Sequence, residues 1–436
     1  MRVGHRPGVL VDQGEFSEAD GHCKILGGGT VGAHAGGHTL SRCAGQRRLV
    51  VNTPCHTWLN VVEFPIHFSF LMEWIFPSDP QQPCRDNASS SVHASCPLTT
   101  KHQFESLPML IYESHYKNIA SIVMESSQLR VTILPESGGK IQSIFNKIEG
   151  NELLIQSQNS EFKRSDYDTS FSDGDQSGFD EVFPTIEACR YPTAPWSGIN
   201  IPDHGEVWTL PWAAERHEDH VMLTVDGVRF PYQLKKKIEF QQENCLKISY
   251  SVANRSDFPF SYIWAPHILF AREEDFEVCL PSAVKTVMST CNLDNKLGGF
   301  GTMHTWPTTV VDDAAYPISK TYPMYPGKCE KYYAMDTLDE GWCALFNPKT
   351  GSAVGLSFPV SDVPYLGIWD GFIGDQCATA LEPCTGAFDD VGVANLWRRV
   401  QSVEGKSARA WYLTLTVDTV KSVEGIDAAG NFKCQK

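Results

Sequence analysis

The amino-acid sequence predicts an all-β protein whose main domain is a large sandwich of antiparallel sheets. Three observations indicate this fold class. Short segments with alternating apolar residues recur from about residue 119 to 417, Gly- and Pro-rich connections separate them, and long amphipathic helical patterns are hard to find. Many short strands with irregular connections pack as face-to-face sheets, because each strand has an apolar side to bury. We place this domain at 105–425 and expect its functional groups on one concave face.

The strands are expected in two groups. The first three follow one another closely at 121–125, 128–134 and 140–145, and Ser137-Gly138-Gly139 supplies one of the turns. Further segments have the alternation or the short apolar run of a strand, namely 221–225, 232–240, 245–252, 258–263, 276–280, 353–358, 378–382 and 408–417. The connections 183–202 and 302–328 are rich in Pro and Gly, which is typical of irregular loops.

The chain outside this domain has a different composition. Acidic and basic residues balance in residues 1–104, so the formal net charge of −16 belongs to the rest of the chain. No sustained apolar period of a strand or a helix appears there. We therefore predict a poorly ordered, largely disordered N-terminal extension at 1–104, with a short apolar hairpin or helix at 60–76, and a C-terminal tail at 426–436.

Charge and composition limit the partners. A net charge of −16 without a basic stripe argues against a nucleic-acid ligand and favours a neutral or weakly charged small molecule. The most apolar window, 58–76, is interrupted by Glu63, Pro65 and Glu73, so we expect no membrane span. The fourteen cysteines are scattered and no export signal opens the chain, which favours reduced thiols and a cytoplasmic location. The oligomeric state is not predicted.

Several common motifs are missing from the sequence. It contains no Cys-x-x-Cys, Walker loop, His-Glu-x-x-His or Gly-x-Ser-x-Gly pattern, which excludes the commonest metal, nucleotide and serine-hydrolase sites. Gly27, Gly29 and Gly32 match the dinucleotide fingerprint, but no strand precedes them and no helix follows. His217 and His220 lie in a strongly polar run, which we interpret as an exposed turn. We predict neither a metal nor an organic cofactor.

The first candidate site segment is Pro202-Asp203-His204-Gly205-Glu206. In the functional interpretation, His204 is held near a ligand oxygen, Gly205 lets backbone come close, and Trp208 or Trp212 offers a flat face to the ligand. In the structural interpretation, the segment is a polar turn in which Asp203 caps the chain. The sequence alone leaves both interpretations open.

The second candidate is His267, which stands in the apolar run Trp264-Ala265-Pro266-His267-Ile268. An isolated histidine in such a run is commonly a hydrogen-bonded core residue. Pro266 favours a functional role, because prolines interrupt strands at positions where a side chain can be directed into a cleft.

The third candidate comprises Trp369-Asp370 and Leu381-Glu382-Pro383, which a short Gly- and Asp-containing turn separates. The spacing predicts two neighbouring strands of a hairpin, so Trp369, Asp370 and Glu382 can converge. Burial would raise the pKa of Glu382 and make it a usable base, whereas at a strand end in solvent it would be an ordinary carboxylate. Two histidines with one carboxylate are the groups that proton transfer near neutral pH requires.

These residues resemble a known family. From about residue 119 to 417 the chain resembles the aldose 1-epimerase (galactose mutarotase) superfamily, particularly its branch related to hexose-6-phosphate epimerases. The likeness rests on Leu134-Pro135-Glu136-Ser137-Gly138-Gly139-Lys140-Ile141, Gly150-Asn151-Glu152-Leu153-Leu154, Pro202-Asp203-His204-Gly205-Glu206, Ala265-Pro266-His267 and Leu381-Glu382-Pro383, and on their order and spacing.

The resemblance implies a β-supersandwich and a set of roles. It implies that His267 is the general acid, that Glu382 is the general base, and that His204 is a second histidine in contact with the sugar. It implies sugar contacts from the stretch that contains Trp369 and Asp370. The implied reaction is mutarotation, in which the sugar ring opens and recloses without a metal or an organic cofactor.

One departure from the family concerns the sugar. Where relatives carry an arginine ahead of the first histidine, this chain has Ser177-Gly178-Phe179-Asp180-Glu181-Val182-Phe183-Pro184. Acidic residues at the place where relatives have an arginine argue against a phosphorylated sugar. We expect Asp180, Glu181 and Arg190 to take over part of the recognition, with Asp203 and Glu206 as further candidate sugar contacts.

Three functions follow from the sequence. The favoured one is an isomerase that interconverts the anomers of a free sugar. The alternative is a carbohydrate-binding protein that keeps the fold and its tryptophans without turnover, motivated by the missing arginine. A lyase or hydrolase on the same sandwich is less favoured, because no second catalytic carboxylate pair is evident.

Overall fold

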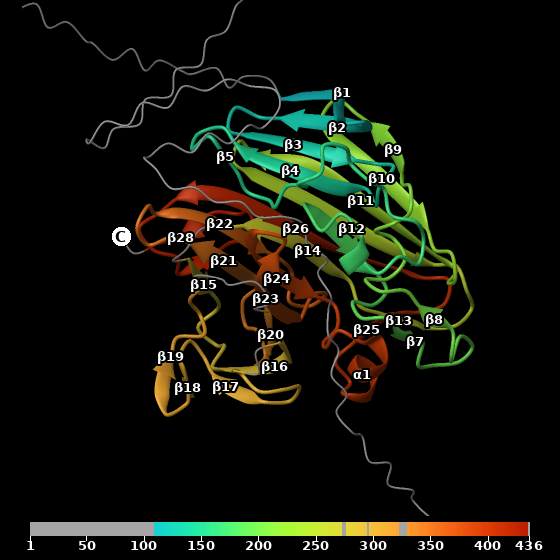
Figure 1. Ribbon diagram of the computed structural model, residues 1–436. Helices are drawn as coiled ribbons and strands as arrows, with labels where there is room; N and C mark the ends of the chain where they lie inside the picture. The colour runs from blue at the N-terminus through green and yellow to red at the C-terminus, as the bar shows by residue number, and fades with distance from the viewer. Residues whose placement is uncertain (1–108, 273–275, 294–295, 322–328, 435–436) are drawn as a thin grey trace, which may run out of the picture. The chain divides into compact units, whose positions relative to one another are not determined.

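The computed structural model describes residues 109–434 except 273–275, 294–295 and 322–328 (Figure 1). The predicted extension at 1–104, its segment 60–76 and the dinucleotide-like match at Gly27, Gly29 and Gly32 lie outside the described residues. Among the residues described, the only α-helix is α1 (Val391–Leu396), and η1 (Phe171–Asp173) is a short 3₁₀ turn. The predicted all-β class is confirmed.

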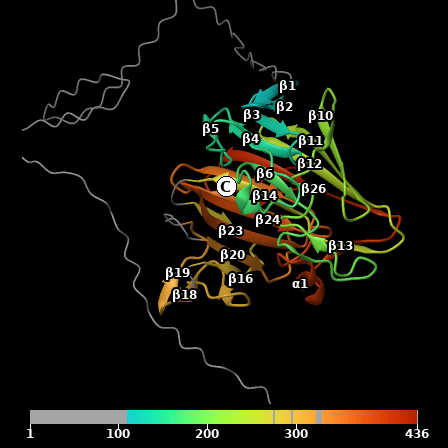
Figure 2. The ribbon, with the colours of Figure 1, turned by 45° about the vertical axis from the view of Figure 1, so that its right-hand side comes forward.

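The first sheet has twelve strands and is antiparallel at every pairing. From edge to edge it contains β1 (Leu110–Tyr116), β2 (Ile119–Glu125), β3 (Leu129–Leu134), β4 (Lys140–Asn146), β6 (Phe179–Val182), β14 (Ala265–Ala271), β24 (Gln376–Cys384), β23 (Tyr365–Ile373), β20 (Cys329–Ala334), β16 (Thr286–Asn292) and β17 (Met303–Thr305), and β5 (Asn151–Glu152) pairs with β4. Figure 2 shows the central strands β6, β14, β24, β23 and β20 side by side.

The second sheet has eight strands and is also antiparallel. Its order is β15 (Glu277–Cys279), β21 (Trp342–Phe346), β22 (Ser352–Ser357), β26 (Ala408–Thr419), β12 (Cys245–Asn254), β11 (Tyr232–Gln242), β10 (His220–Asp226) and β9 (Ala213–Arg216). Four two-stranded ribbons complete the described part of the fold: β7 (Cys189–Arg190) with β8 (Asn200–Ile201), β13 (Phe260–Tyr262) with β25 (Gln401–Val403), β18 (Thr309–Val311) with β19 (Ala314–Tyr316), and β27 (Gly425–Ile426) with β28 (Phe432–Lys433).

The two large sheets meet across a core that includes one buried ion pair. Glu181 of β6 accepts a hydrogen bond from Lys236 of β11 at 3.0 Å, and both side chains are fully buried. Tyr250 of β12 and the indole of Trp264 donate to the same carboxylate at 3.0 and 2.9 Å. Each oxygen of Glu181 therefore has a partner, as a buried charge requires.

Strand alternation decides which residues reach the outer face of the first sheet. Lys331 of β20 pairs in register with Trp369 of β23, and Trp369 pairs with Ala380 of β24, which pairs with Leu269 of β14. His267 and Glu382 lie two residues from Leu269 and Ala380, so they point to the same face. Glu181 points the other way, into the core.

Every strand segment predicted from the sequence overlaps an observed strand, and the predicted hairpin is β23–β24. The sequence did not reveal β1, β6, β14, β16, β20 or β21 as strands. The segment predicted as a C-terminal tail contains β28, which pairs with β27, and Ile426 of that ribbon packs against Trp342 and Ala344.

Candidate active site

A hollow of about 430 Å³ opens on the outer face of the first sheet, over β14, β23 and β20. Its lining includes His204, His267, Lys331, Trp369 and Asp389, with Phe171 and Leu269 as apolar neighbours. This volume lies within the range of small-molecule sites. We call this hollow the cleft.

Glu382 lies behind the lining of the cleft and is fully buried. One of its carboxylate oxygens, Oε2, is 2.7 Å from Lys331 Nζ, and the other, Oε1, is 3.9 Å from His267 Nε2. Burial raises the pKa of the Glu382 carboxyl, and the charge of Lys331 opposes that rise. Burial, which the sequence analysis gave as the reason for a raised pKa of Glu382, is thus observed. The ammonium group of Lys331 beside the carboxylate was not predicted.

His267 stands on β14 beside Glu382 and is 8% exposed. Burial lowers the pKa of His267 well below its ordinary value, and the positive charges of His204, Lys331 and Lys140 lower it further. Its Nδ1 atom has no hydrogen-bond partner among the described residues. A neutral imidazole with a free nitrogen therefore faces the buried carboxyl. The two pKa shifts run in opposite directions because burial favours the neutral form of both groups.

His204 is held in place by Asp203 and Phe171. Its Nδ1 atom is 2.8 Å from Asp203 Oδ1, and its ring stacks on Phe171 with centroids 4.1 Å apart. Ser170 and the backbone N–H of Phe171 donate to the other oxygen of Asp203 at 3.0 and 2.8 Å. Burial raises the pKa of Asp203, but the hydrogen bond and charge of His204 outweigh it and bring the pKa to about 2. The contact between Asp203 Oδ1 and His204 Nδ1 fixes the orientation of the His204 ring at the edge of the cleft.

The two imidazoles meet edge to face with ring centroids 5.0 Å apart, and Phe171 packs edge-on to His267 at 4.8 Å. The sequence-predicted catalytic residues His204, His267 and Glu382 are therefore neighbours in space, although 178 positions separate the first from the last (382 − 204).

Lys331 and Asp389 are site residues that the sequence analysis missed. Lys331 Nζ is 2.7 Å from Glu382 Oε2 and also 2.7 Å from Asp389 Oδ1. Burial lowers the pKa of Lys331, but the two carboxylates outweigh it and raise the pKa overall. Tyr333 donates its hydroxyl to Asp389 at 2.7 Å. No local signal marks Lys331, because the segment Cys329–Ala334 that forms β20 does not alternate apolar and polar residues.

Trp369 lines the cleft, as the sequence analysis expected for a sugar contact. Its indole N–H contacts Cys329 Sγ at 3.0 Å, and that sulfur is 4.0 Å from Cys291 Sγ. Cys291 also lines the cleft, and the contact with Cys329 lowers the pKa of the Cys291 thiol to about 7. Sequence reasoning gave no role to either cysteine.

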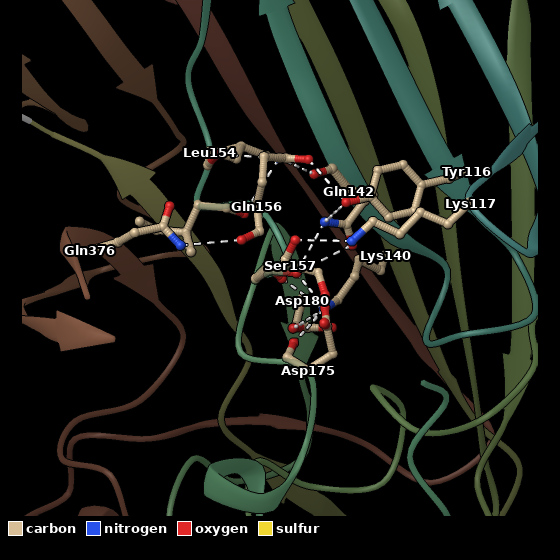
Figure 3. A network of polar contacts seen from close by, with 12 residues as sticks. Tyr116, Lys117, Lys140, Gln142, Leu154, Gln156, Ser157, Asp175, Asp180 and Gln376 are labelled. Carbon is tan, nitrogen blue, oxygen red and sulfur yellow. Dashed lines mark hydrogen bonds and ion pairs between the residues drawn. The ribbon is translucent and has the colours of Figure 1, made fainter. Parts of the chain in front are cut away.

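Asp180 lies one strand away from His267 and is paired with it in register. It is buried and forms an ion pair with Lys140 at 3.1 Å, within the polar network of Figure 3. Lys140 also contacts Asp175 at 3.6 Å and donates to the carbonyl of Ser177 at 2.7 Å. Burial raises the pKa of Asp180 to about 6, with Lys140 opposing. Asp180 therefore stands beside His267 on the same face of the sheet, but it is not among the residues that line the cleft.

Two other predicted contacts lie away from the cleft. Asp370 points from β23 to the opposite face, where it accepts from Arg272 at 2.7 Å and from Thr379 at 2.7 Å. Glu206 is fully buried and accepts from the hydroxyls of Tyr167 and Tyr232 at 2.7 and 2.9 Å. These two carboxylates have structural partners and do not line the cleft, so their contact with a ligand stays a prediction.

Arg190 lies on β7, is exposed, and lines a second hollow beside the cleft. Trp208 and Trp212, considered as flat faces for a ligand, are buried and donate their indole N–H groups to backbone carbonyls. Glu181, weighed as a substitute for the missing arginine, is occupied inside the sandwich. Gly205 does permit a close backbone approach, because a Cβ atom there would lie 2.0 Å from the carbonyl oxygen of Phe183.

The described residues contain no group of three or more His, Cys, Asp or Glu side chains arranged to hold a metal ion. His217 and His220 stack on each other at 4.2 Å, at the β9–β10 hairpin. None of the helices in the described ranges has the length and apolar character that crossing a bilayer needs.

Comparison with known proteins finds similarity to solved structures only. No protein-family model matches the sequence, and no curated protein matches it. Among solved structures, the Slr1438 protein of Synechocystis sp. PCC 6803 is 17% identical with a TM-score of 0.51, over 72% of this chain and 98% of that one. A Klebsiella pneumoniae protein provisionally named an aldose 1-epimerase is 13% identical with a TM-score of 0.54, over 70% of this chain and 83% of that one.

A galactose mutarotase-like protein of Clostridium acetobutylicum is 14% identical, with a TM-score of 0.51 over 72% of this chain and 99% of that one. At such identities the likeness establishes the architecture, and it covers nearly the whole length of two of these neighbours. The chain therefore has the galactose mutarotase-like fold.

Proposed function

We propose that this protein is an aldose 1-epimerase-like isomerase that interconverts the anomers of a neutral sugar by general acid/base catalysis. The observation that carries the proposal is the approach of His267 Nε2 to within 3.9 Å of the buried Glu382 carboxylate, beside His204 and next to a cleft of small-molecule size. The fold shared with a protein provisionally named an aldose 1-epimerase supports it.

The reaction uses the two groups in turn. Glu382 takes the proton of the anomeric hydroxyl while His267 gives a proton to the ring oxygen, so the hemiacetal opens to a free aldehyde. Rotation about the bond between the first two carbons and reclosure deliver the other anomer, with the roles reversed. Because each group must act as acid and as base, the reaction depends on the pKa values of both, and burial shifts both: it raises the pKa of Glu382 and lowers that of His267.

The charges at the cleft favour a neutral substrate. Asp203, Glu187 and Asp389 line it, and Lys331 is already paired with two carboxylates. The lining contains no arginine within the described part of the chain. Carboxylates accept hydrogen bonds from sugar hydroxyls and repel phosphate, while the partly exposed Trp369 ring offers a face for the sugar's C–H groups. The nine cysteines of the described residues are free thiols, which fits a cytoplasmic enzyme.

The test is Glu382→Gln, assayed by polarimetry and by NMR exchange between anomers of several aldoses. The amide keeps the shape of the side chain but cannot take the proton, so the rate should fall about 10²–10⁴-fold. Glu215→Gln, which alters a carboxylate that is 77% exposed on β9, is the matched control and should keep full activity. Equal rates for wild type and Glu382→Gln on every sugar would sink the proposal.

A carbohydrate-binding protein without turnover is the second candidate. It is favoured by the ion pair that holds Glu382 against Lys331 at 2.7 Å, because a carboxylate fixed by an ammonium group is a weaker base. Sugar binding measured by calorimetry, with no gain in anomer exchange, would identify this function.

A further inference from the structure

A second hollow of about 720 Å³ adjoins the cleft, over the β7–β8 ribbon and the segment that leads to His204. Its lining includes Arg190, Asn200 and Arg229, together with Asp168. Glu187 and Asp203 line both hollows. The two spaces therefore meet along a wall that these two carboxylates share.

This shared wall is tied directly to the candidate catalytic groups. Asp203 contacts His204 at 2.8 Å, and the backbone N–H of Glu187 donates to the carbonyl of Asp389 at 2.9 Å. The carboxylate of Asp389 contacts Lys331, which contacts Glu382. A ligand that extends from the cleft past Glu187 and Asp203 into the second hollow therefore contacts residues that are linked to His204, Lys331 and Glu382.

The lining of the second hollow contains both hydrogen-bond donors and acceptors. Arg229 is fixed by Asp168 at 2.8 Å and by the carbonyl of Asn200 at 2.7 Å, and it lies over the ring of Tyr167 at 5.3 Å. Arg190 is exposed on β7 and faces the hollow without a recorded ion pair among the described residues. Three carboxylates and two guanidinium groups nearly balance in charge, which suits the hydroxyls of a neutral sugar better than an anion.

We propose that the second hollow is a subsite for an additional sugar unit, so that the substrate is the reducing end of a neutral disaccharide or longer oligosaccharide. The inference rests on the proposed function and names its substrate class. Only a free anomeric carbon can open, so the reducing unit occupies the cleft and the next unit crosses Glu187 and Asp203 to meet Arg190.

The test compares maltose, cellobiose and lactose with glucose and galactose in NMR exchange. For at least one disaccharide, kcat/KM should exceed that of both monosaccharides roughly 10-fold, which corresponds to one or two added hydrogen bonds. Arg190→Ala should lower the disaccharide value several-fold and reduce this preference. Arg130→Ala removes an exposed arginine on β3, away from both hollows, and should keep the preference.

Binding to the Glu382→Gln variant separates the subsite from the activity. Calorimetry should find a disaccharide bound about 10-fold more tightly than a monosaccharide, with the difference reduced by Arg190→Ala. If this holds while no sugar is turned over by wild type, the subsite stands and the proposed function falls. If anomer exchange occurs but disaccharides and monosaccharides behave alike in both assays, the subsite is refuted and the function remains. Failure of every sugar to bind overturns both.

Discussion

Lys331 opposes the rise that burial causes in the pKa of Glu382, so the first prediction concerns this pair. Lys331→Met leaves a fully buried carboxyl without its ammonium partner at 2.7 Å, and the pKa of Glu382 should rise further. Breaking a buried pair costs about 3–5 kcal/mol when the remaining group stays charged. The acid limb of the kcat/KM profile should move to higher pH, because a larger fraction of Glu382 is protonated and unable to act as base.

The sign of the stability change follows from linkage. A carboxyl whose folded pKa lies above its unfolded value binds its proton more tightly when folded. Lys331→Met should therefore be least destabilised at acid pH and lose stability as the pH rises through the raised pKa of Glu382. Urea unfolding from pH 4 to 9 measures this. The double variant Lys331→Met/Glu382→Gln should show a weaker pH dependence, and an equal dependence in both variants would contradict the assignment.

At single positions, the sequence predicted the residues whose chemistry is unusual for their surroundings. His267 in an apolar run and Glu382 at the end of a strand-like run both lie at the candidate site. Asp370 was expected beside Trp369 at the cleft, but adjacent residues of a strand point to opposite faces of the sheet. Trp369 therefore lines the cleft, whereas Asp370 contacts Arg272. Lys331 could not be selected, because a lysine in an unrecognised strand has the same local pattern as a solvated one.

At the scale of elements, the sequence revealed strands that alternate but missed β14, which is buried on both faces, and β6, which is short. β14 is apolar throughout apart from His267 and contains Pro266, which argues against a central strand. β6 has only four residues, two of them acidic, and both acidic side chains are buried by ion pairs with distant lysines. Such partners are set by the packing of distant segments, which local patterns do not encode.

The turn that carries His204 gives the prediction for this scale. Gly205 has a φ of +75°, and an added Cβ would lie 2.0 Å from the carbonyl oxygen of Phe183, a backbone atom. Gly205→Ala should therefore displace the loop, lower activity at least 10-fold, and destabilise the fold by more than the roughly 1–2 kcal/mol that a left-handed alanine costs.

Gly374→Ala is the matched control for that change. Gly374 has a φ of +61° in the β23–β24 turn, but nothing lies within 4 Å of its added Cβ. The Gly374→Ala variant should lose only the free energy of unfolding that a left-handed alanine costs, and it should keep its activity. Chemical unfolding and anomer exchange of both variants make the comparison, and equal losses in the two would contradict a steric role for Gly205.

For the whole molecule, the position of the cleft depends on how β6 and β14 are fixed to the second sheet. Glu181 and Asp180 are adjacent on β6, and one points into the core while the other lies in register with His267. The Glu181–Lys236 pair joins β6 to β11, and the Trp264 indole, next to the start of β14, donates to the same carboxylate. The sequence identified Glu181 only as a candidate ligand contact, because its partners lie 55 to 83 residues further along the chain.

This buried network leads to the last prediction. Lys236→Met or Glu181→Gln alone should destabilise the protein by about 3–5 kcal/mol, because each leaves an uncompensated charge or an unpaired polar group between the sheets. The double variant Glu181→Leu/Lys236→Met replaces both with apolar groups and should be less destabilised than the sum of comparable single changes. Removing the exposed Lys433–Glu340 pair, with side chains 52% and 47% exposed, should cost no more than about 1 kcal/mol. Guanidinium unfolding checks all four variants. Additive losses in the double variant would mean that Glu181 and Lys236 stabilise the sheets independently, and that the ion pair does not couple β6 to the second sheet.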